Sequence, residues 1–98
     1  MRRGEIWTYH PHGSARRRTI VLISSDGINV SPRPWLIAAE VVDADPQDIL
    51  AVSVDRYGWL HAGNIGRIYR GWLAERIDAV DPETLDRLDT ALRAAMDL

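Results

Sequence analysis

Three consecutive arginines, Arg16, Arg17 and Arg18, are the residues best suited to chemistry in this chain. They run directly into an apolar, β-branched stretch, residues 19–23, which is typical of a strand that is covered on both faces. On charge alone, the run fits a solvated loop at a sheet edge as well as it fits phosphate binding. The strand favours phosphate binding, because a guanidinium held rigidly at a strand end can be aimed at a reacting phosphate. Arg18 is therefore the candidate catalytic cation.

Two histidines, His10 and His12, flank Pro11 shortly before this run. The proline and the following Gly13 place them in a turn, with no third ligand nearby. Since metal sites use three or four ligands in fixed geometry, we expect contact with a nucleic acid here and no metal site. His61 follows a predicted hairpin and either faces the same cleft or lies exposed.

The aromatic residues are four tryptophans and three tyrosines, with no phenylalanine, so tryptophan is expected to fill much of the core. Trp59, in a turn, and Tyr9, at a strand end, are the better candidates for stacking on unpaired bases. All 12 basic residues are arginine, whose planar fork suits phosphates and bases. The residues predicted to bind nucleic acid are His10, His12, Arg16, Arg17 and Trp59.

Length and composition limit the architecture. The 98 residues predict one domain, spanning residues 1–98. The chain has no cysteine, no signal-peptide pattern and no apolar run long enough to cross a membrane, so we expect a cytoplasmic protein without a membrane association. Residues 1–70 carry nine arginines and seven acids, whereas residues 71–98 carry three arginines and seven acids. The body is thus mildly basic and the tail acidic, and no Walker motif or glycine-rich phosphate loop is present.

Short strands and one terminal helix dominate the pattern. Asp81 is a good N-cap and Pro82 suits the first helical position. The apolar stripe that follows is Leu85, Leu88, Leu92 and Met96. Strands are predicted at residues 5–9, 19–24, 35–42, 49–54, 64–69 and 75–80. These elements predict a mainly β fold with a C-terminal helix, arranged as a small, partly open SH3-like barrel.

The order of several motifs resembles the MazF/PemK toxin family. The opening MRRGEIW is similar to that family's first segment, and Arg18-Thr-Ile-Val-Leu-Ile-Ser24 resembles its Arg-Pro followed by a hydrophobic strand ending in serine. Ser24-Ser-Asp-Gly-Ile-Asn29 resembles its Ser-Asn-Asp-x-x-Asn turn. Gly63-Asn-Ile-Gly-Arg67 falls where the family has an Asp-Asn-Ile or Asp-Gln-Ile strand, and Asp81-Pro-Glu-Thr-Leu85 resembles the start of its closing helix. The resemblance covers nearly the whole chain.

This resemblance implies a homodimer, a cognate antitoxin, and cleavage of single-stranded RNA without a metal or cofactor. In the family, the ribose 2′-hydroxyl attacks its own phosphate and leaves a 2′,3′-cyclic phosphate and a 5′-hydroxyl. The arginine that matches Arg18 serves in acid–base or charge-stabilising chemistry. Arg16 and Arg17 would then attract the RNA backbone.

One departure concerns the second catalytic group. The family has a threonine or serine at the end of its third strand, but the corresponding segment here is Glu40-Val-Val-Asp43. Val42 stands where the hydroxyl is expected, and a valine side chain neither donates nor accepts a hydrogen bond. Asp43 and Ser53 are the candidate substitutes, and we name Asp43 beside Arg18 as catalytic. Thr19 in place of the usual proline is a milder change.

Two alternatives remain at this stage. The first is a catalytically silent, CcdB-like toxin that binds RNA or a protein target such as DNA gyrase. CcdB-type proteins act through a terminal Trp-Gly-Ile, whereas this chain ends Met96-Asp-Leu98, which argues against gyrase. The second is a structural β-domain that only dimerises, for which changing Arg18 would have no effect.

Overall fold

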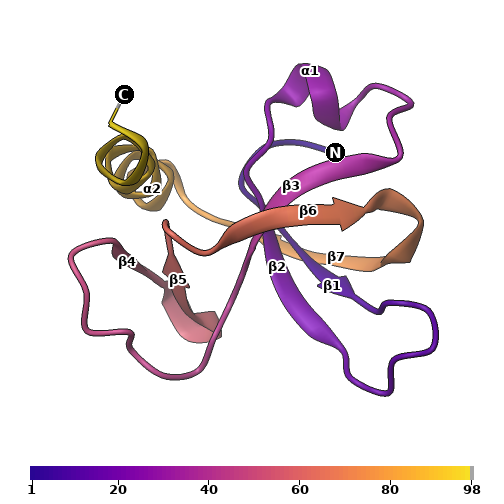
Figure 1. Cartoon of the computed structure of the whole chain (residues 1–98), viewed down its shortest axis with the longest axis horizontal. Helices are drawn as coiled ribbons and strands as arrows, with labels where there is room; N and C mark the ends of the chain where they lie inside the picture. Colours follow the sequence, from indigo (N-terminus) through magenta and orange to yellow (C-terminus); the bar gives the residue numbers. More distant parts are fainter. Residues whose placement is uncertain (98) are drawn as a thin grey trace.

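The structure, a computed structural model, describes residues 1–97. Leu98, the last residue of the predicted domain and of the segment Met96-Asp-Leu98, lies outside the described residues. A five-stranded antiparallel sheet with the strand order β6-β3-β2-β1-β7 forms most of the fold (Figure 1). Its strands are β1 (Glu5–Tyr9), β2 (Arg18–Leu22), β3 (Trp35–Glu40), β6 (Ile65–Tyr69) and β7 (Leu73–Ala79).

The sheet is not closed, because β6 and β7 are its two edges. The stretch that follows the arginine run is β2, the middle strand, as its apolar sequence predicts. The predicted class, mainly β with a C-terminal helix and only partly closed, is confirmed. Among residues 1–97 no helix is long and apolar enough to cross a lipid bilayer.

A separate two-stranded hairpin joins β4 (Ala51–Val54) to β5 (Gly58–His61) through the 3-10 helix η1 (Asp55–Tyr57). Gly58 has a φ of +130°, and a Cβ at this position would collide with the carbonyl oxygen of Val42. Val42 forms an isolated bridge with Trp59. The third strand was predicted to reach residue 42, but it ends at Glu40. Val41 still donates a hydrogen bond to Thr19, whereas Val42 pairs with Trp59 of β5 instead.

Helix α2 (Pro82–Met96) begins and packs as predicted. The carboxylate of Asp81 accepts the Thr84 N–H at 2.7 Å, which satisfies a free amide of the first turn. Leu88 and Leu92 are buried, whereas Met96 at the end of the stripe is 49% exposed. In Figure 1, α2 and the β4–β5 hairpin lie together on one side of the sheet.

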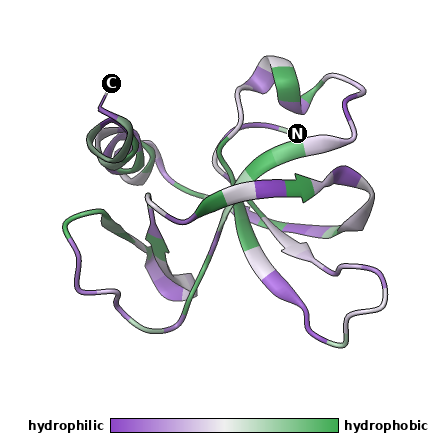
Figure 2. Ribbon diagram, viewed as in Figure 1, coloured by the Kyte–Doolittle hydropathy of each residue, from purple (hydrophilic) through white to green (hydrophobic). Residues whose placement is uncertain are grey.

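The two faces of the sheet carry separate cores. On the helix face, residues such as Val21 and Ala39 pack against α2 and the hairpin. On the other face, which we call the cavity face, Ile20 and Leu22 of β2 pack with residues of the neighbouring strands. Figure 2 shows β2 changing from hydrophilic at its start to hydrophobic toward the centre of the sheet. The buried core residues of the cavity face are Tyr9, Ile20, Leu22, Leu36, Ala38 and Ile68.

The connection between β2 and β3 contains α1 (Asp26–Asn29), where the sequence predicted only a turn. Ser25 caps this single helical turn by accepting the Ile28 N–H, and the buried side chain of Asn29 bonds to Ser24. The guanidinium of Arg70, in the 3-10 helix η2 (Arg70–Trp72), donates to four carbonyl oxygens of this connection. The connection is therefore tied to the end of the edge strand β6, the neighbour of β3, and this contact positions the start of β3.

Candidate active site

Arg18 is the first residue of β2 and lies directly opposite Tyr9 of β1. Because side chains alternate along a strand, Arg18 projects from the same face as Ile20 and Leu22, which is the cavity face. Its side chain is exposed, yet it lines two concave surfaces. Within residues 1–97 its guanidinium forms no ion pair. The backbone of Arg18 is fixed by the sheet, and its charged side chain is left available to an anionic ligand.

The first cavity, of about 180 Å³, lies on the cavity face between β1, β2, β3 and β6. Ile20, Ala38 and Ile68 form its apolar floor, and the space above Gly66 is open. The hydroxyl oxygen of Tyr9 accepts the Tyr69 N–H at 3.0 Å, which fixes the ring beside Arg18. The lining residues are Tyr9, Arg18, Ile20, Ala38, Glu40, Asn64, Ile65, Gly66, Arg67 and Ile68.

The second cavity, of about 230 Å³, lies where β2 begins and β3 ends. It is lined by all three arginines of the run and by Asp43, so the structure brings the two predicted catalytic residues to one surface. Arg16 forms an ion pair of 3.5 Å with Glu40 across this cavity. The lining residues are Arg16, Arg17, Arg18, Thr19, Glu40, Val41, Val42 and Asp43.

Three residues predicted to bind RNA lie away from the walls of both cavities. His10 and His12 are exposed in the loop between β1 and β2, next to the arginine run in sequence. The His10 Nε2 contacts the carbonyl oxygen of Ser14 at 2.7 Å, which folds the loop on itself. Trp59 is half-buried on β5, with its backbone paired to Val42 of the second cavity.

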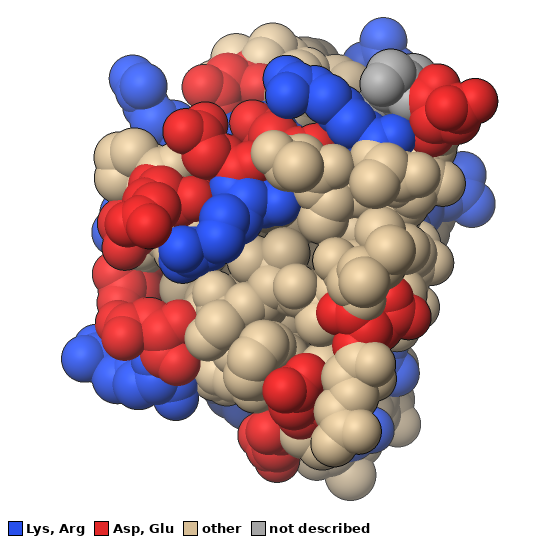
Figure 3. Space-filling view, turned by 90° about the vertical axis from the view of Figure 1, so that its left-hand side faces the viewer, with Lys and Arg blue, Asp and Glu red and all other residues tan. Residues whose placement is uncertain are grey.

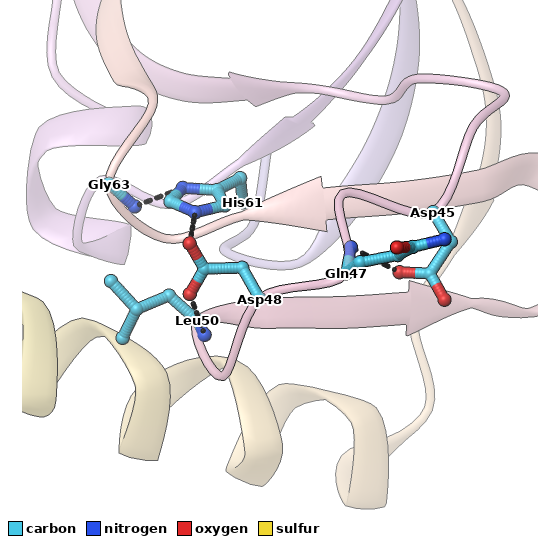
Figure 4. Close-up of polar contacts among 6 residues, drawn as sticks. All are labelled: Asp45, Gln47, Asp48, Leu50, His61 and Gly63. Carbon is cyan, nitrogen blue, oxygen red and sulfur yellow. Dashed lines mark hydrogen bonds and ion pairs between the residues drawn. The ribbon is translucent and has the colours of Figure 1, made fainter.

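The remaining candidates belong to the β4–β5 hairpin. Ser53 lies opposite Trp59 and does not line either cavity. His61 accepts the Gly63 N–H at Nδ1, so its Nε2 carries the proton and donates to Asp48 at 3.0 Å (Figure 4). This hydrogen bond holds the pKa of Asp48 below its usual value. His61 therefore fixes the loop before β4 and does not face the cleft of Arg18.

One side chain of the site was missed as a candidate by the sequence analysis. Glu40 lines both cavities, and a signal for it existed, because it follows Leu36 and Ala38 at every second position of one strand. Arg67 of the edge strand β6 also borders the first cavity, but it lies opposite Ile37, so its side chain projects from the other face of the sheet. Its guanidinium lies 4.5 Å from the centre of the Trp35 ring.

Metal ligation has no candidate here. Across the described part of the chain, residues 1–97, no three His, Cys, Asp or Glu side chains come together in a group that could hold a metal ion. Among the described residues, the cationic side chains at the second cavity are Arg16, Arg17 and Arg18.

The opposite side of the molecule has a different character. A groove of about 400 Å³ runs between β4 and α2, and Ile49 beside it is 94% exposed. Figure 3 shows this side as a largely uncharged surface bordered by acidic groups and a few arginines. The only basic residue that lines the groove, Arg87, is paired with Glu83 at 3.1 Å. This groove therefore offers no unpaired positive charge to a polyanion such as a nucleic acid.

No protein-family model matches the sequence, and no curated protein matches it. Solved structures match the fold over the whole chain. An endoribonuclease from a mycobacterial species, solved in complex with its cognate antitoxin, superposes with a TM-score of 0.87 at 19% identity, covering 100% of this chain and 96% of that one. The Mycobacterium tuberculosis toxin MazF-mt6 gives a TM-score of 0.80 at 13% identity, covering 96% and 97% of the two chains. MazF from Deinococcus radiodurans gives 0.78 at 16% identity, covering 100% and 97%. At these identities the likeness concerns the fold, and the fold predicted from the motifs, that of the MazF-type toxins, is confirmed.

Proposed function

We propose that this chain, as a single domain over residues 1–98, is the toxin of a toxin–antitoxin pair and cleaves single-stranded RNA in the cytoplasm. The observation that carries the proposal is the placement of Arg18. It is anchored at the start of the central strand, has no ion-pair partner among residues 1–97, and lines two cavities that meet at its side chain. The fold shared with solved MazF endoribonucleases supports the same reading.

The reaction is an internal transfer at phosphorus. The ribose 2′-oxygen attacks the adjacent phosphate, the bond to the 5′-oxygen breaks, and the products carry a 2′,3′-cyclic phosphate and a 5′-hydroxyl. Negative charge accumulates on the non-bridging oxygens during this attack. The guanidinium of Arg18, carried on the first residue of the central strand, stabilises that charge. We propose that no metal ion takes part.

RNA binding extends from this centre along the arginine run. Arg16 and Arg17 are exposed at the second cavity and would contact phosphates on one side of the scissile bond. His10 and His12, in the adjoining loop, and Trp59, next to Val42, would contact the flanking nucleotides. These contacts are largely electrostatic, so binding should weaken steeply with added salt.

We propose two protein partners. The first is a cognate antitoxin, because a mycobacterial endoribonuclease and a Deinococcus radiodurans MazF of the same fold were each solved with one. An extended antitoxin segment with acidic or apolar side chains would cover the two cavities. The second is another copy of this chain, which would double the RNA surface in a homodimer.

A carboxylate beside Arg18 would complete the chemistry. Val42 lines the second cavity and supplies no hydroxyl, and Ser53 does not line this cavity. Asp43, named from the sequence, lines the second cavity and stays a candidate for the proton-accepting group.

The test is to incubate the purified protein with a long single-stranded RNA, with and without EDTA, and to map the ends. We expect EDTA-insensitive cleavage that leaves 2′,3′-cyclic phosphates. Arg18→Ala should lower the cleavage rate by about 10²–10³ or more, the typical cost of removing one preorganised charge-stabilising group. Arg93→Ala, an exposed arginine of α2, makes the same charge change outside the site and should cleave normally. Growth arrest on expression with intact RNA would instead identify a silent, CcdB-like binder.

A further inference from the structure

Glu40 holds a position that no other carboxylate of the site shares. Comparing the linings of the two cavities, the residues common to both are Arg18 and Glu40. Glu40 is the last residue of β3 and lies opposite Ile20 in the antiparallel register. Ile20 is two residues from Arg18 on β2 and therefore on the same face. Glu40 and Arg18 thus project from the cavity face of two neighbouring strands. The Arg18 cation and the Glu40 carboxylate thus lie together between the two cavities.

Glu40 is also held more firmly than its ion-pair partner. Its side chain is 29% exposed, whereas that of Arg16 is 75% exposed and lies in the loop before β2. An exposed ion pair at 3.5 Å contributes little to stability, so it gives no structural reason for a carboxylate at this place. The pair does leave one carboxylate oxygen without a hydrogen-bond partner among residues 1–97.

Asp43 is less well placed for the same task. It is exposed, lies three residues past the end of β3 and lines only the second cavity. A general base must come within hydrogen-bonding reach of the proton that it removes, and a group at a strand end is positioned better than one in a loop. The geometry therefore favours Glu40 over Asp43.

We propose that Glu40 is the proton acceptor for the ribose 2′-hydroxyl and replaces the hydroxyl side chain that is missing at Val42. This inference rests on the proposed function. Glu40 takes the proton from the 2′-oxygen as that oxygen forms its bond to phosphorus. The bond from phosphorus to the 5′-oxygen breaks, the 5′-oxygen takes a proton from water, and Glu40 releases its proton to solvent. The net change is one proton moved from the 2′-oxygen to the 5′-oxygen.

The test compares Glu40→Gln with the wild type in single-turnover cleavage of a short RNA that contains one mapped site. Loss of a general base should slow cleavage by about 10²–10⁴-fold. RNA affinity, measured with the same RNA carrying a 2′-deoxy group at the cleaved position, should be unchanged or tighter, since a negative charge is removed. The acid limb of the wild-type pH–rate profile should be absent from the residual activity of Glu40→Gln. Glu40→Asp, which keeps a carboxylate, should recover part of the rate.

Glu75→Gln is the matched control, because Glu75 is an exposed residue of β7 that does not line either cavity. It should cleave at the wild-type rate. If Arg18→Ala abolishes cleavage while Glu40→Gln stays within about threefold of the wild type, the inference is overturned and the proposed function stands. The same holds if Asp43→Asn loses the acid limb and Glu40→Gln keeps it. Failure of the wild type itself to cleave any RNA would overturn both.

Discussion

Arg70 offers a test of how the site is positioned, because its guanidinium ties the β2–β3 connection to the sheet. Its Nε donates to the carbonyl oxygen of Arg33 and its Nη1 to that of Asn29, each at 2.8 Å. Its Nη2 donates to the carbonyl oxygens of Ser31 and Ile28, at 2.8 Å and 3.2 Å. Arg70→Ala removes all four bonds and frees the segment that leads into β3.

The size of the effect follows from these bonds. A hydrogen bond to a charged group contributes about 1.5–3 kcal/mol, but at this half-buried place the freed carbonyls regain water, so we expect a net loss of about 3 kcal/mol. The entropy of unfolding, about 2.1 cal/mol/K per residue, gives about 0.2 kcal/mol/K for 98 residues. The melting temperature should therefore fall by about 15 °C.

Thermal unfolding followed by circular dichroism measures this shift. Arg70→Lys keeps the charge but replaces the planar fork by a point charge, so we expect it to recover less than half of the loss. Arg93→Ala, on the exposed face of α2, controls for the removal of an arginine. An Arg70→Ala protein that melts within about 3 °C of the wild type would contradict this reasoning. It would show that water replaces the four hydrogen bonds of Arg70 without a loss of stability.

Three further predictions follow from the core, the carboxylates and the arginine run. Leu88→Ala removes a fully buried side chain of α2 and should lower the free energy of unfolding, measured in urea, by about 2–5 kcal/mol. Met96→Ala, at a half-exposed position of the same helix, should change it little. The pKa values of Asp48, Asp78 and Asp81 are lowered, chiefly by hydrogen bonds from His61, the Ala79 N–H and the Thr84 N–H respectively. Because the pKa values of these exposed carboxylates are lower in the folded state than in the unfolded chain, about 4, their stabilisation is present above that pH and is lost as the pH falls further. The urea midpoint should therefore decrease below about pH 4. Finally, Arg16→Ala and Arg17→Ala should each weaken RNA binding and reduce the slope of log affinity against log salt concentration by about 0.7. An unchanged slope would show that the substituted arginine does not contact a phosphate.

The fold was largely predictable because its signals are local. The run 19–23 is apolar on both faces and becomes the central strand, and Asp81 followed by Pro82 begins the helix as expected. The end of β3 was predicted two residues too late, since Val41 and Val42 continue a β-branched pattern. The pairing of Val42 is decided by Trp59, whose backbone exchanges two hydrogen bonds of 2.9 Å with it. No local pattern reports such a long-range contact.

The site was predictable in part, for the same reason. The arginine run is contiguous, so its charge was visible, and the structure places all three arginines at one cavity. Glu40 comes to the site through the register of β3 against β2. A shift of one residue in that register would turn its side chain to the other face, and a single sequence does not fix the register.

The position of Val42 explains why a proton-accepting group would move along the strand. Val41 still donates a hydrogen bond to Thr19 of β2, but the next residue, Val42, exchanges both backbone hydrogen bonds with Trp59 of β5. The half-buried Val42 lines the second cavity, and its side chain offers no hydrogen-bonding group there. Two residues earlier, at Glu40, the strand still pairs with β2, and alternation directs the side chain to the face of Arg18. The last residue of β3 is therefore the point nearest to Val42 where regular sheet geometry places a polar side chain on the face of Arg18.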